Sequence, residues 1–273
     1  MTEVDFDQIS SYQRYKLMAS LIVPRPIALV TTLGANGVIN AAPFSMFNMI
    51  GEDPPILMIS INRLQDGRLK DTAANILRNG EFVVHMSDEP MAQKMHNCGE
   101  SMPSDVSELT AVGLTPVPSH TVAPPRIQEA PIAFECVLHE KLETPSRYVF
   151  IGRIQWLAAR EGLIDTEAWR VNLRDYKPVA RFGASFYTRT EDRFSLSDKP
   201  GEAPVVNTVA TVDTSRSGVS WAAIFAGAAG VGDGAVEVQP IRSQTLGRGR
   251  GVDLAAAPQE VGSIPMGVHR FPQ

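Results

Sequence analysis

The dipeptide Asn36–Gly37 limits the fold of this chain more than any other feature of its sequence. It lies between two strand-like runs, Ile27–Leu33 and Val38–Ala42. Asn-Gly readily supplies the two positive φ angles of a type I′ turn, and such turns join neighbouring antiparallel strands. A third strand is expected at Ile56–Ile61. The connections between these strands are too short for parallel crossovers, so the sheet is predicted to be antiparallel.

Helices are expected to interrupt the strands. The first opens near Lys70, with Asp71 as its capping residue, and ends at Gly80. The second covers Glu89–Cys98. A third, helix-like patch surrounds Trp169. These segments are too few and too short for a helical protein, so they are expected to decorate a sheet.

The later strands follow a long irregular segment. Residues 99–130 are rich in Pro, Ser and Thr, which predicts a surface excursion with one helical turn near residues 107–113. Residues 132–143 alternate apolar and polar side chains, as a half-buried strand does, and residues 147–160 form the next strand. A short closing element is expected near residues 182–187. At least six strands with a few helices predict a mainly β (α+β) fold, an antiparallel barrel with flanking helices.

Composition and charge exclude several classes of protein. The net charge of -5 offers no basic surface for nucleic acid. Apolar runs are shorter than the roughly 20 residues of a membrane span, and the acidic N-terminus lacks the apolar segment of a secretory signal. Cys98 and Cys136 are expected to be free buried thiols in a reducing cytosol. We therefore expect a cytoplasmic protein with no nucleic-acid or membrane partner.

The character of the sequence changes near residue 199. Beyond Pro200 the chain has no lysine and no tyrosine, and it is crowded with Gly, Ala, Val and Ser. Such a composition offers too little apolar surface to offset the entropy of ordering. We therefore expect one domain over residues 1–198 and a low-complexity, disordered tail over residues 199–273.

The connection Asn40–Pro55 is unusually apolar for a loop. It combines aromatic side chains with small residues and a proline, which let a ligand approach the main chain. Its polar side chains could hydrogen-bond the edge of a flat heteroaromatic ring. The residues concerned are Asn40, Ala41, Ala42, Pro43, Phe44, Ser45 and Asn48. The alternative is an apolar crossover that only packs against the sheet.

Basic side chains gather just after the third predicted strand. Arg63, Arg68 and Lys70 follow Ser60, and Asp71–Thr72 open a helix. Cationic side chains, a hydroxyl group and free helix amides are what a phosphate monoester requires. The alternative is a solvated basic loop with an N-capping aspartate. A ring shelf and a phosphate clamp on adjacent segments together indicate a mononucleotide such as FMN.

Motifs for independent acid–base or metal chemistry are absent from the sequence. It has no G-x-G-x-x-G, no Walker P-loop and no G-x-S-x-G, and its five histidines lack metal-ligand spacing. A cofactor that carries the reactivity explains this absence, because the protein then supplies only shape and hydrogen bonds. We therefore assign no catalytic side chain and no metal ligand.

Several motifs occur in the order found in one protein family. They are Pro-Arg-Pro-Ile at residues 24–27, Asn-x-Ala-Pro-Phe-Ser at 40–45, Asp-Pro-Pro at 53–55, Lys-Asp-Thr at 70–72, and the later runs VFIGRI and YKPVARFGASFY. With these motifs, about residues 10–196 resemble the flavin reductase-like family, the FMN-binding split barrels. The resemblance implies a six-stranded antiparallel split β-barrel, a homodimer, and FMN bound near the dimer interface.

The resemblance also implies two groups of residues around FMN. The isoalloxazine and ribityl chain would meet Arg25, Asn40, Ala42, Pro43, Phe44, Ser45 and Asn48. The phosphate would be surrounded by Ser60, Arg63, Lys70, Asp71 and Thr72. Asp71 is expected to cap the helix rather than touch the anion, and Arg181 to lie at the rim. One region departs from the family: Arg147–Tyr148 stand where many relatives carry a histidine near the nicotinamide.

The function implied is an oxidoreductase that reduces FMN with NADH or NADPH. Electrons would pass to free flavin, a partner monooxygenase or another small acceptor. Hydride transfer needs close positioning but no acid or base from the protein, which agrees with the missing motifs. The alternatives are a non-enzymatic FMN-binding electron carrier, and a split barrel that binds heme or a deazaflavin.

Overall fold

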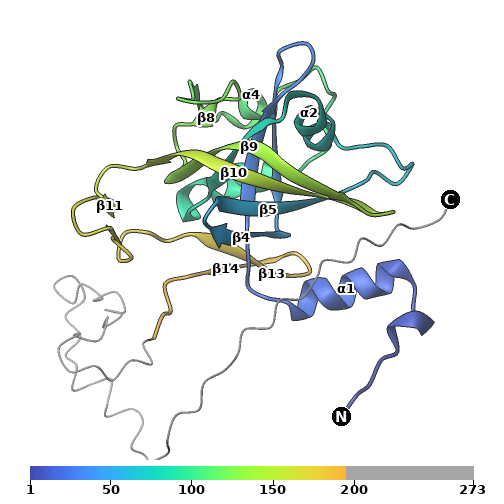
Figure 1. Ribbon diagram of the computed structural model, residues 1–273. Helices are drawn as coiled ribbons and strands as arrows, with labels where there is room; N and C mark the ends of the chain where they lie inside the picture. Colours follow the sequence, from blue (N-terminus) through green and yellow to red (C-terminus); the bar gives the residue numbers. More distant parts are fainter. Residues whose placement is uncertain (195–273) are drawn as a thin grey trace, which may run out of the picture. The chain divides into compact units, whose positions relative to one another are not determined.

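The computed structural model describes residues 1–194, and its centre is a seven-stranded antiparallel sheet (Figure 1). The strand order is β3-β2-β6-β9-β10-β5-β4. These strands are β2 (Ala28–Leu33), β3 (Ile39–Phe44), β4 (Phe47–Glu52), β5 (Pro55–Asn62), β6 (Glu81–Met86), β9 (Ile132–Glu143) and β10 (Arg147–Ala159). The mainly β class predicted from the sequence is thus confirmed.

Smaller elements surround this sheet. A three-stranded sheet is formed by β1 (Arg25–Pro26), β13 (Val179–Gly183) and β14 (Phe186–Arg189). Two short pairs join β7 (Pro116–Val117) to β8 (Arg126–Ile127) and β11 (Ile164–Asp165) to β12 (Arg170–Val171). The helices are η1 (Phe6–Gln8), α1 (Ser11–Leu21), α2 (Asp71–Asn79), η2 (Glu89–Met91), α3 (Ala92–Asn97) and α4 (Glu108–Val112). The predicted tail, residues 199–273, lies outside the described residues.

The main sheet has seven strands rather than the expected six, because the apolar connection Asn40–Pro55 is itself extended. Its first part belongs to β3 and its second to β4, which pairs with β5. The interpretation of this segment as a loop was therefore wrong. Only Ser45 and Met46 separate β3 from β4, although the two strands stand at opposite ends of the sheet order. The sheet must curve back on itself to bring them together, which produces the barrel.

Asn36–Gly37 closes the hairpin between β2 and β3, but not as a type I′ turn. Gly37 has a φ of 79°, whereas Asn36 is not among the described residues with positive φ. The Gly37 amide donates to the Gly34 carbonyl at 3.0 Å, and the Gly34 amide donates to the Val38 carbonyl at 2.8 Å. These bonds define a three-residue loop whose last position is a left-handed glycine. The antiparallel hairpin was predicted correctly, but its turn type was not.

Helix α1 was not foreseen from the sequence. The Ser10 side chain accepts a bond from the Gln13 amide, and the Gln13 side chain accepts one from the Ser10 amide, which is a capping box. Ala19 is the one buried residue of the helix. Figure 1 shows α1 beside β13, with which it makes contact. Because so little of α1 is buried, its apolar pattern was too weak to predict it.

Helix α2 begins and ends at well-defined positions. Lys70 is its N-cap and makes no side-chain capping bond, so the prediction of Asp71 as the cap was wrong. Asp71 is instead the first helical residue, and it is exposed. Gly80 ends the helix with a left-handed φ of 71°, as predicted. Ala73 and Ile76 turn into the core of the barrel.

Two apolar cores lie on the two faces of the sheet. The barrel interior holds large side chains such as Phe82 and Phe150. The second core packs α3, α4 and β8 against the outer face of β2 and β3, and it includes Leu109 and Ile127. Residues 99–130 lie mostly at the surface, as predicted, and the helical turn is present as α4. A few of their apolar side chains, Leu109, Leu114 and Ile127, belong to the second core, which sequence periodicity could not reveal.

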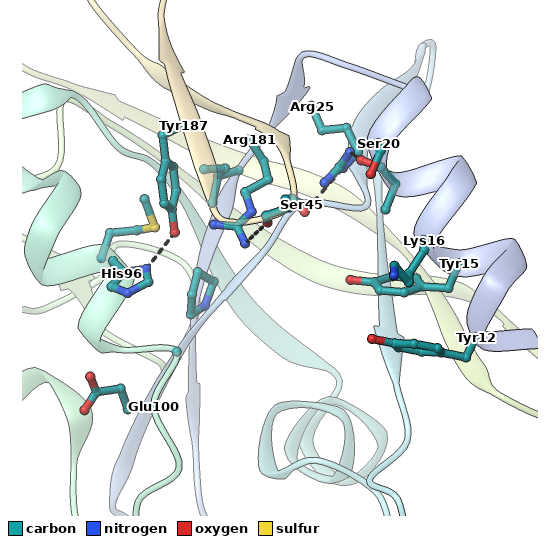
Figure 2. Close-up of a pocket in the computed structure, with 16 residues that line it drawn as sticks. Tyr12, Tyr15, Lys16, Ser20, Arg25, Ser45, His96, Glu100, Arg181 and Tyr187 are labelled. Carbon is teal, nitrogen blue, oxygen red and sulfur yellow. Dashed lines mark hydrogen bonds between the residues drawn. The ribbon is translucent and has the colours of Figure 1, made fainter.

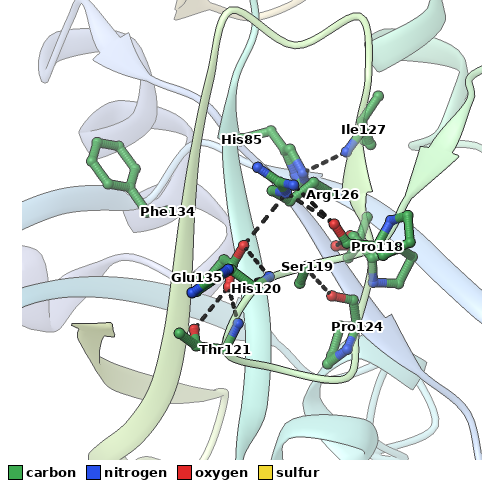
Figure 3. A network of polar contacts seen from close by, with 12 residues as sticks. His85, Pro118, Ser119, His120, Thr121, Pro124, Arg126, Ile127, Phe134 and Glu135 are labelled. Carbon is green, nitrogen blue, oxygen red and sulfur yellow. Dashed lines mark hydrogen bonds and ion pairs between the residues drawn. The ribbon is translucent and has the colours of Figure 1, made fainter. Parts of the chain in front are cut away.

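A buried carboxylate holds part of this segment against the barrel (Figure 3). Glu135 of β9 is fully buried and accepts bonds from the His120 and Thr121 amides at 2.6–2.9 Å. Arg126 lies 3.4 Å from the same carboxylate. Burial alone would raise the pKa of Glu135, but the hydrogen bonds from His120 and Thr121 outweigh it, so the pKa is lowered. The ionised Glu135 carboxylate and its hydrogen-bond partners therefore hold residues 120–126 against β9 and stabilise the fold.

His85 performs a similar structural role on β6. Its Nδ1 lies 2.9 Å from the Leu29 carbonyl, and its Nε2 lies 3.0 Å from the Ile127 amide. The carbonyl needs a donor and the amide an acceptor, so the neutral ring with a proton on Nδ1 satisfies both. Burial lowers the pKa of His85 to about 4, with the Leu29 bond opposing the change. His85 thus links β2, β6 and β8 and is not free for catalysis.

The helix-like patch predicted around Trp169 is absent. Trp169 lies between β11 and β12 with a positive φ of 52°, and the residue is 84% exposed. A short helix there would have no apolar surface to pack against, and helices of this length are not stable alone.

Candidate functional site

A cavity of about 510 Å³ opens between α1, the end of β3, α3 and the β13–β14 hairpin (Figure 2). This volume lies within the usual range for small-molecule sites. The cavity is lined by Tyr12, Tyr15, Lys16, Ala19, Ser20, Arg25, Ile27, Pro43, Ser45, Met95, His96, Gly99, Glu100, Arg181, Ala184 and Tyr187. It is the candidate functional site of the domain.

Three of the residues predicted to meet a flavin ring line this cavity: Arg25, Pro43 and Ser45. Arg25 lies on β1, where its Nε donates to the Ser45 hydroxyl at 3.4 Å. Its Nη1 donates to the carbonyls of Ala19 and Ile22 at the end of α1. Arg25 therefore joins α1 to the β3–β4 corner and presents a cation at the cavity wall. Arg181, expected at the rim, also lines the cavity.

The other predicted ring contacts lie outside the cavity. Ala42 and Phe44 pack with the barrel interior, and the Phe44 side chain is only 6% exposed. Asn48 is exposed on β4, at the edge of the main sheet. Asn40 donates to the Thr72 hydroxyl at 2.9 Å, and so connects β3 to the start of α2. None of these four residues is among the described residues that line the cavity.

Two partly buried cations, Lys70 and Arg147, lie near one another beside the cavity. The Lys70 ammonium is 5.9 Å from the Phe44 ring centre, and the Arg147 guanidinium is 5.8 Å from the ring centre of Tyr15, which lines the cavity. Burial lowers the pKa of Lys70 and Arg147 lowers it further, while burial also lowers the pKa of Arg147. Within residues 1–194 neither cation forms an ion pair. An anion bound here would relieve their mutual repulsion.

Further anion-binding groups lie close to these cations. Lys70 leaves the first amides of α2 without a side-chain cap. Ile61 of β5 and Tyr148 of β10 are paired and both point into the barrel core. Because successive side chains of a strand alternate in direction, the adjacent residues Ser60 and Arg147 both point away from that core. Ser60 is itself buried, with 7% of its surface exposed. Two neighbouring cations, one of them at the uncapped start of a helix, are the kind of groups that a phosphate site requires.

The remaining predicted phosphate residues are placed differently. Arg63 forms an ion pair with Glu143, donates to the Gly67 carbonyl at 3.3 Å and lies over the Tyr148 ring. A phosphate would have to compete with Glu143 for its guanidinium. Thr72 is buried and accepts the bond from Asn40, while Asp71 points to solvent. The Thr72 hydroxyl is thus engaged at the helix start, and Asp71 is an exposed residue of the first helical turn.

Several cavity residues were missed by sequence reasoning. Tyr12, Tyr15 and Lys16 come from α1, which the Ser10–Gln13 capping box could have revealed. His96 and Tyr187 meet at the cavity wall from positions 91 residues apart, so no local pattern could have joined them. Within residues 1–194 no group of His, Cys, Asp and Glu side chains could hold a metal ion. None of the described helices is long and apolar enough to cross a membrane.

Comparison with known proteins adds to this geometry. Residues 18–180 match the family model of the flavin reductase like domain. The protein YwrF of Bacillus subtilis (strain 168) is 40% identical over 196 residues, which is 70% of this chain and 95% of YwrF. The arrangement of strands is that of a split barrel.

Two solved structures are similar in sequence and in fold. The 2-nitrobenzoate 2-nitroreductase NbaA of Pseudomonas fluorescens is 39% identical with a TM-score of 0.66, and the match covers 75% of this chain and 100% of NbaA. The nitrilotriacetate monooxygenase component B of Bacillus cereus is 33% identical with a TM-score of 0.68, and the match covers 72% of this chain and 98% of that protein.

Proposed function

Because this chain belongs to the flavin reductase-like family, we propose that it is an FMN-dependent oxidoreductase. It takes electrons from NADH or NADPH and passes them to free flavin, a partner monooxygenase or another small acceptor. When bound, the flavin supplies the hydride chemistry, for which the chain offers no side-chain motif of its own. The protein's part is to bind, orient and shield.

The observation that carries this proposal is the pair of partly buried cations, Lys70 and Arg147, which lack an anionic partner among the described residues. Burying a cation without a partner is costly, so such a pair is retained where a ligand supplies the charge. We assign the FMN phosphate to these cations, the first amides of α2 and the Ser60 hydroxyl. Arg63 contributes only if it leaves Glu143.

The isoalloxazine is assigned to the cavity beside this phosphate site. Arg25 and Ser45 offer a cation and a hydroxyl, and Pro43 offers an apolar surface. Asn40 and Thr72 hold the start of α2 in place, and Ala42 and Phe44 fix the β3 backbone by packing in the barrel. Asp71, an exposed acidic residue in the first turn of α2, is assigned no contact with the phosphate. Asn48 is assigned to a surface that a second subunit covers.

Both cysteines are buried and free, which supports a reducing, cytoplasmic location.

Two of the similar proteins bear on the electron acceptor. The monooxygenase component and the nitroreductase among the similar proteins support a partner monooxygenase and a small acceptor respectively. A carrier that receives its electrons from another protein is the second candidate, because Arg147–Tyr148 stand where many relatives carry a histidine near the nicotinamide. The response of bound flavin to NADH and NADPH distinguishes a reductase from such a carrier.

A homodimer is also part of the proposal. β4 is an edge strand of the main sheet, and its Met49 and Ile50 are 66% and 49% exposed. Exposed apolar side chains on an edge strand favour association with another chain. Phe47, in contrast, packs on the barrel core, so a charge there would disturb folding rather than the interface. Met49→Asp is therefore the better test: we expect a folded monomer by sedimentation, and an unchanged dimer would remove β4 from the interface.

The experiment that tests the function is identification of the bound cofactor. The protein is purified, its absorbance is measured, and the released ligand is identified by mass spectrometry. NADH and then NADPH are added without oxygen while the oxidised-flavin absorbance is followed. Bleaching by either nucleotide supports a reductase, and bleaching only with a reducing partner supports a carrier. A chain that neither retains flavin nor binds added FMN refutes both.

A further inference from the structure

One wall of the cavity has no role in the FMN binding proposed above. It is formed by His96 of α3, Tyr187 of β14 and Arg181 of β13 (Figure 2). His96 Nδ1 lies 2.8 Å from the Tyr187 hydroxyl, and the two rings meet edge to face with centroids 5.8 Å apart. The Arg181 guanidinium lies 4.7 Å from the Tyr187 ring centre. The three side chains therefore form one connected polar group that faces the cavity.

The charge around the cavity is predominantly positive. Lys16, Arg25 and Arg181 line it, and Glu100 is the one carboxylate among its described lining residues. None of these cations forms an ion pair within residues 1–194. Burial lowers the pKa of Arg25 and Arg181 lowers it further, with Tyr15 opposing them. Unpaired like charges around one cavity favour an anionic ligand.

This positive charge is distinct from the phosphate site. Lys70 and Arg147 do not line the cavity, so an FMN phosphate held by them would leave Lys16 and Arg181 without an anion. Figure 2 shows Lys16 on the α1 side of the cavity and His96 with Tyr187 on the opposite side, with Arg181 between them. A second, smaller anion in the cavity would pair with the cations that line it.

The donors on this wall suit a carboxylate. Arg181 donates one bond to the Ala184 carbonyl at 2.6 Å, which leaves further guanidinium N–H groups for a ligand. If His96 donates from Nδ1 to the Tyr187 oxygen, the Tyr187 hydroxyl proton is free to donate to a ligand. A guanidinium group matches the two oxygens of a carboxylate. The aromatic surfaces of Tyr187 and of Tyr15 across the cavity favour a flat molecule.

We propose that His96, Arg181 and Tyr187 form a binding subsite for a small planar carboxylic acid, of the class of aromatic acids. Arg181 and Tyr187 contact the carboxylate, and His96 positions the Tyr187 hydroxyl. Lys16 adds longer-range attraction from α1. The inference rests on the proposed function in one respect: the acid binds in the same cavity as the flavin ring, as a small electron acceptor would.

The test uses benzoate and benzamide, which share their shape and differ in charge. Each is titrated by calorimetry into the FMN-loaded full chain, and the flavin absorbance spectrum is recorded in parallel. We expect benzoate to bind at least about tenfold more tightly than benzamide, as loss of one charge-assisted contact implies. Equal affinities, or a preference for benzamide, would overturn the proposal, because the wall would then suit a neutral, nicotinamide-like ligand.

Variants assign the effect to particular side chains. Arg181→Gln and Tyr187→Phe are each expected to weaken benzoate binding by about fivefold or more while leaving benzamide binding unchanged. Arg170→Gln, an exposed position on β12 outside the cavity lining, is the matched control and should change neither. Tyr187→Phe keeps the ring and removes one hydroxyl group, so its result stands even if Arg181→Gln folds poorly. Unchanged benzoate affinity in Tyr187→Phe and in folded Arg181→Gln would refute the assignment.

Failure of this inference can be distinguished from failure of the proposed function. FMN binding is measured first, and its absence would refute the flavoprotein assignment alone. Benzoate is then titrated into the FMN-free chain as well, where the same side chains and the same preference over benzamide are expected. FMN binding without benzoate binding in either form would leave the flavoprotein assignment intact and reject the subsite.

Discussion

Neutralising Lys70 or Arg147 should change cofactor binding and protein stability in opposite directions. With FMN bound, each cation gains a phosphate partner, and a hydrogen bond to a charged group contributes about 1.5–3 kcal/mol. Lys70→Met and Arg147→Gln should therefore raise the FMN dissociation constant roughly 10- to 150-fold. Without FMN the two cations repel each other and are partly desolvated. Removing either charge should then leave the FMN-free protein at least as stable as the original.

The assay measures both quantities on the same preparations. FMN affinity is obtained from quenching of flavin fluorescence, and the stability of the FMN-free chain from urea unfolding. Arg68→Gln is the matched control, because Arg68 lies two residues before Lys70 but is 76% exposed and paired with Asp66. It should change FMN affinity little, since exposed ion pairs contribute about 0–1 kcal/mol. Unchanged FMN affinity in both Lys70→Met and Arg147→Gln would refute the phosphate assignment, and a clear loss of stability would refute the argument from repulsion.

Three further outcomes are expected. The buried His85 should make the free energy of unfolding fall as the pH drops from 6.5 towards 4, because in this range the unfolded chain binds a proton at His85 and the folded chain, where the pKa is about 4, does not. Urea unfolding should show a loss of roughly 3 kcal/mol, and the loss should be smaller in His85→Gln. Gly152→Ala should destabilise the barrel by about 1–3 kcal/mol, because the added Cβ would overlap the Phe82 ring. Adding Phe82→Leu to the same chain should restore part of the lost stability, and a Gly152→Ala variant as stable as the original would contradict the packing. A chain ending at Lys199 should fold, dimerise and bind FMN like the full chain, because the family match ends at residue 180; a truncated chain that is insoluble or monomeric would show that the domain extends farther.

The phosphate assignment shows how far local sequence could lead. A strand, a basic loop and a helix start follow one another from Ser60 to Thr72, so their proximity was set by chain connectivity alone. The same locality explains why the end of α2 at Gly80 and the strands β9 and β10 could be predicted. Turn residues, helix ends and two-residue alternation act over a few positions, and the sequence displays them directly.

The pairing of individual side chains depended on contacts between distant segments. Arg63 looked like a phosphate ligand, but Glu143, 80 residues later, lies beside it because β10 pairs with β5 on one side and with β9, which ends at Glu143, on the other. Arg147 looked like a departure from a family pattern, and the same pairing places it on the face that carries Ser60. Which charges are neutralised and which remain free is a property of strand register, and register was not readable from either segment alone.

The sequence by itself determined an antiparallel, mainly β domain with a basic helix start and no catalytic motif of its own. The tertiary structure alone decided that the apolar segment after the first hairpin becomes two strands, so that Phe44 turns into the barrel while Pro43 faces the cavity. It also decided that His96, Arg181 and Tyr187 share one wall. The physical reason is that backbone preferences are local, whereas burial and pairing depend on which segments the closed sheet brings together.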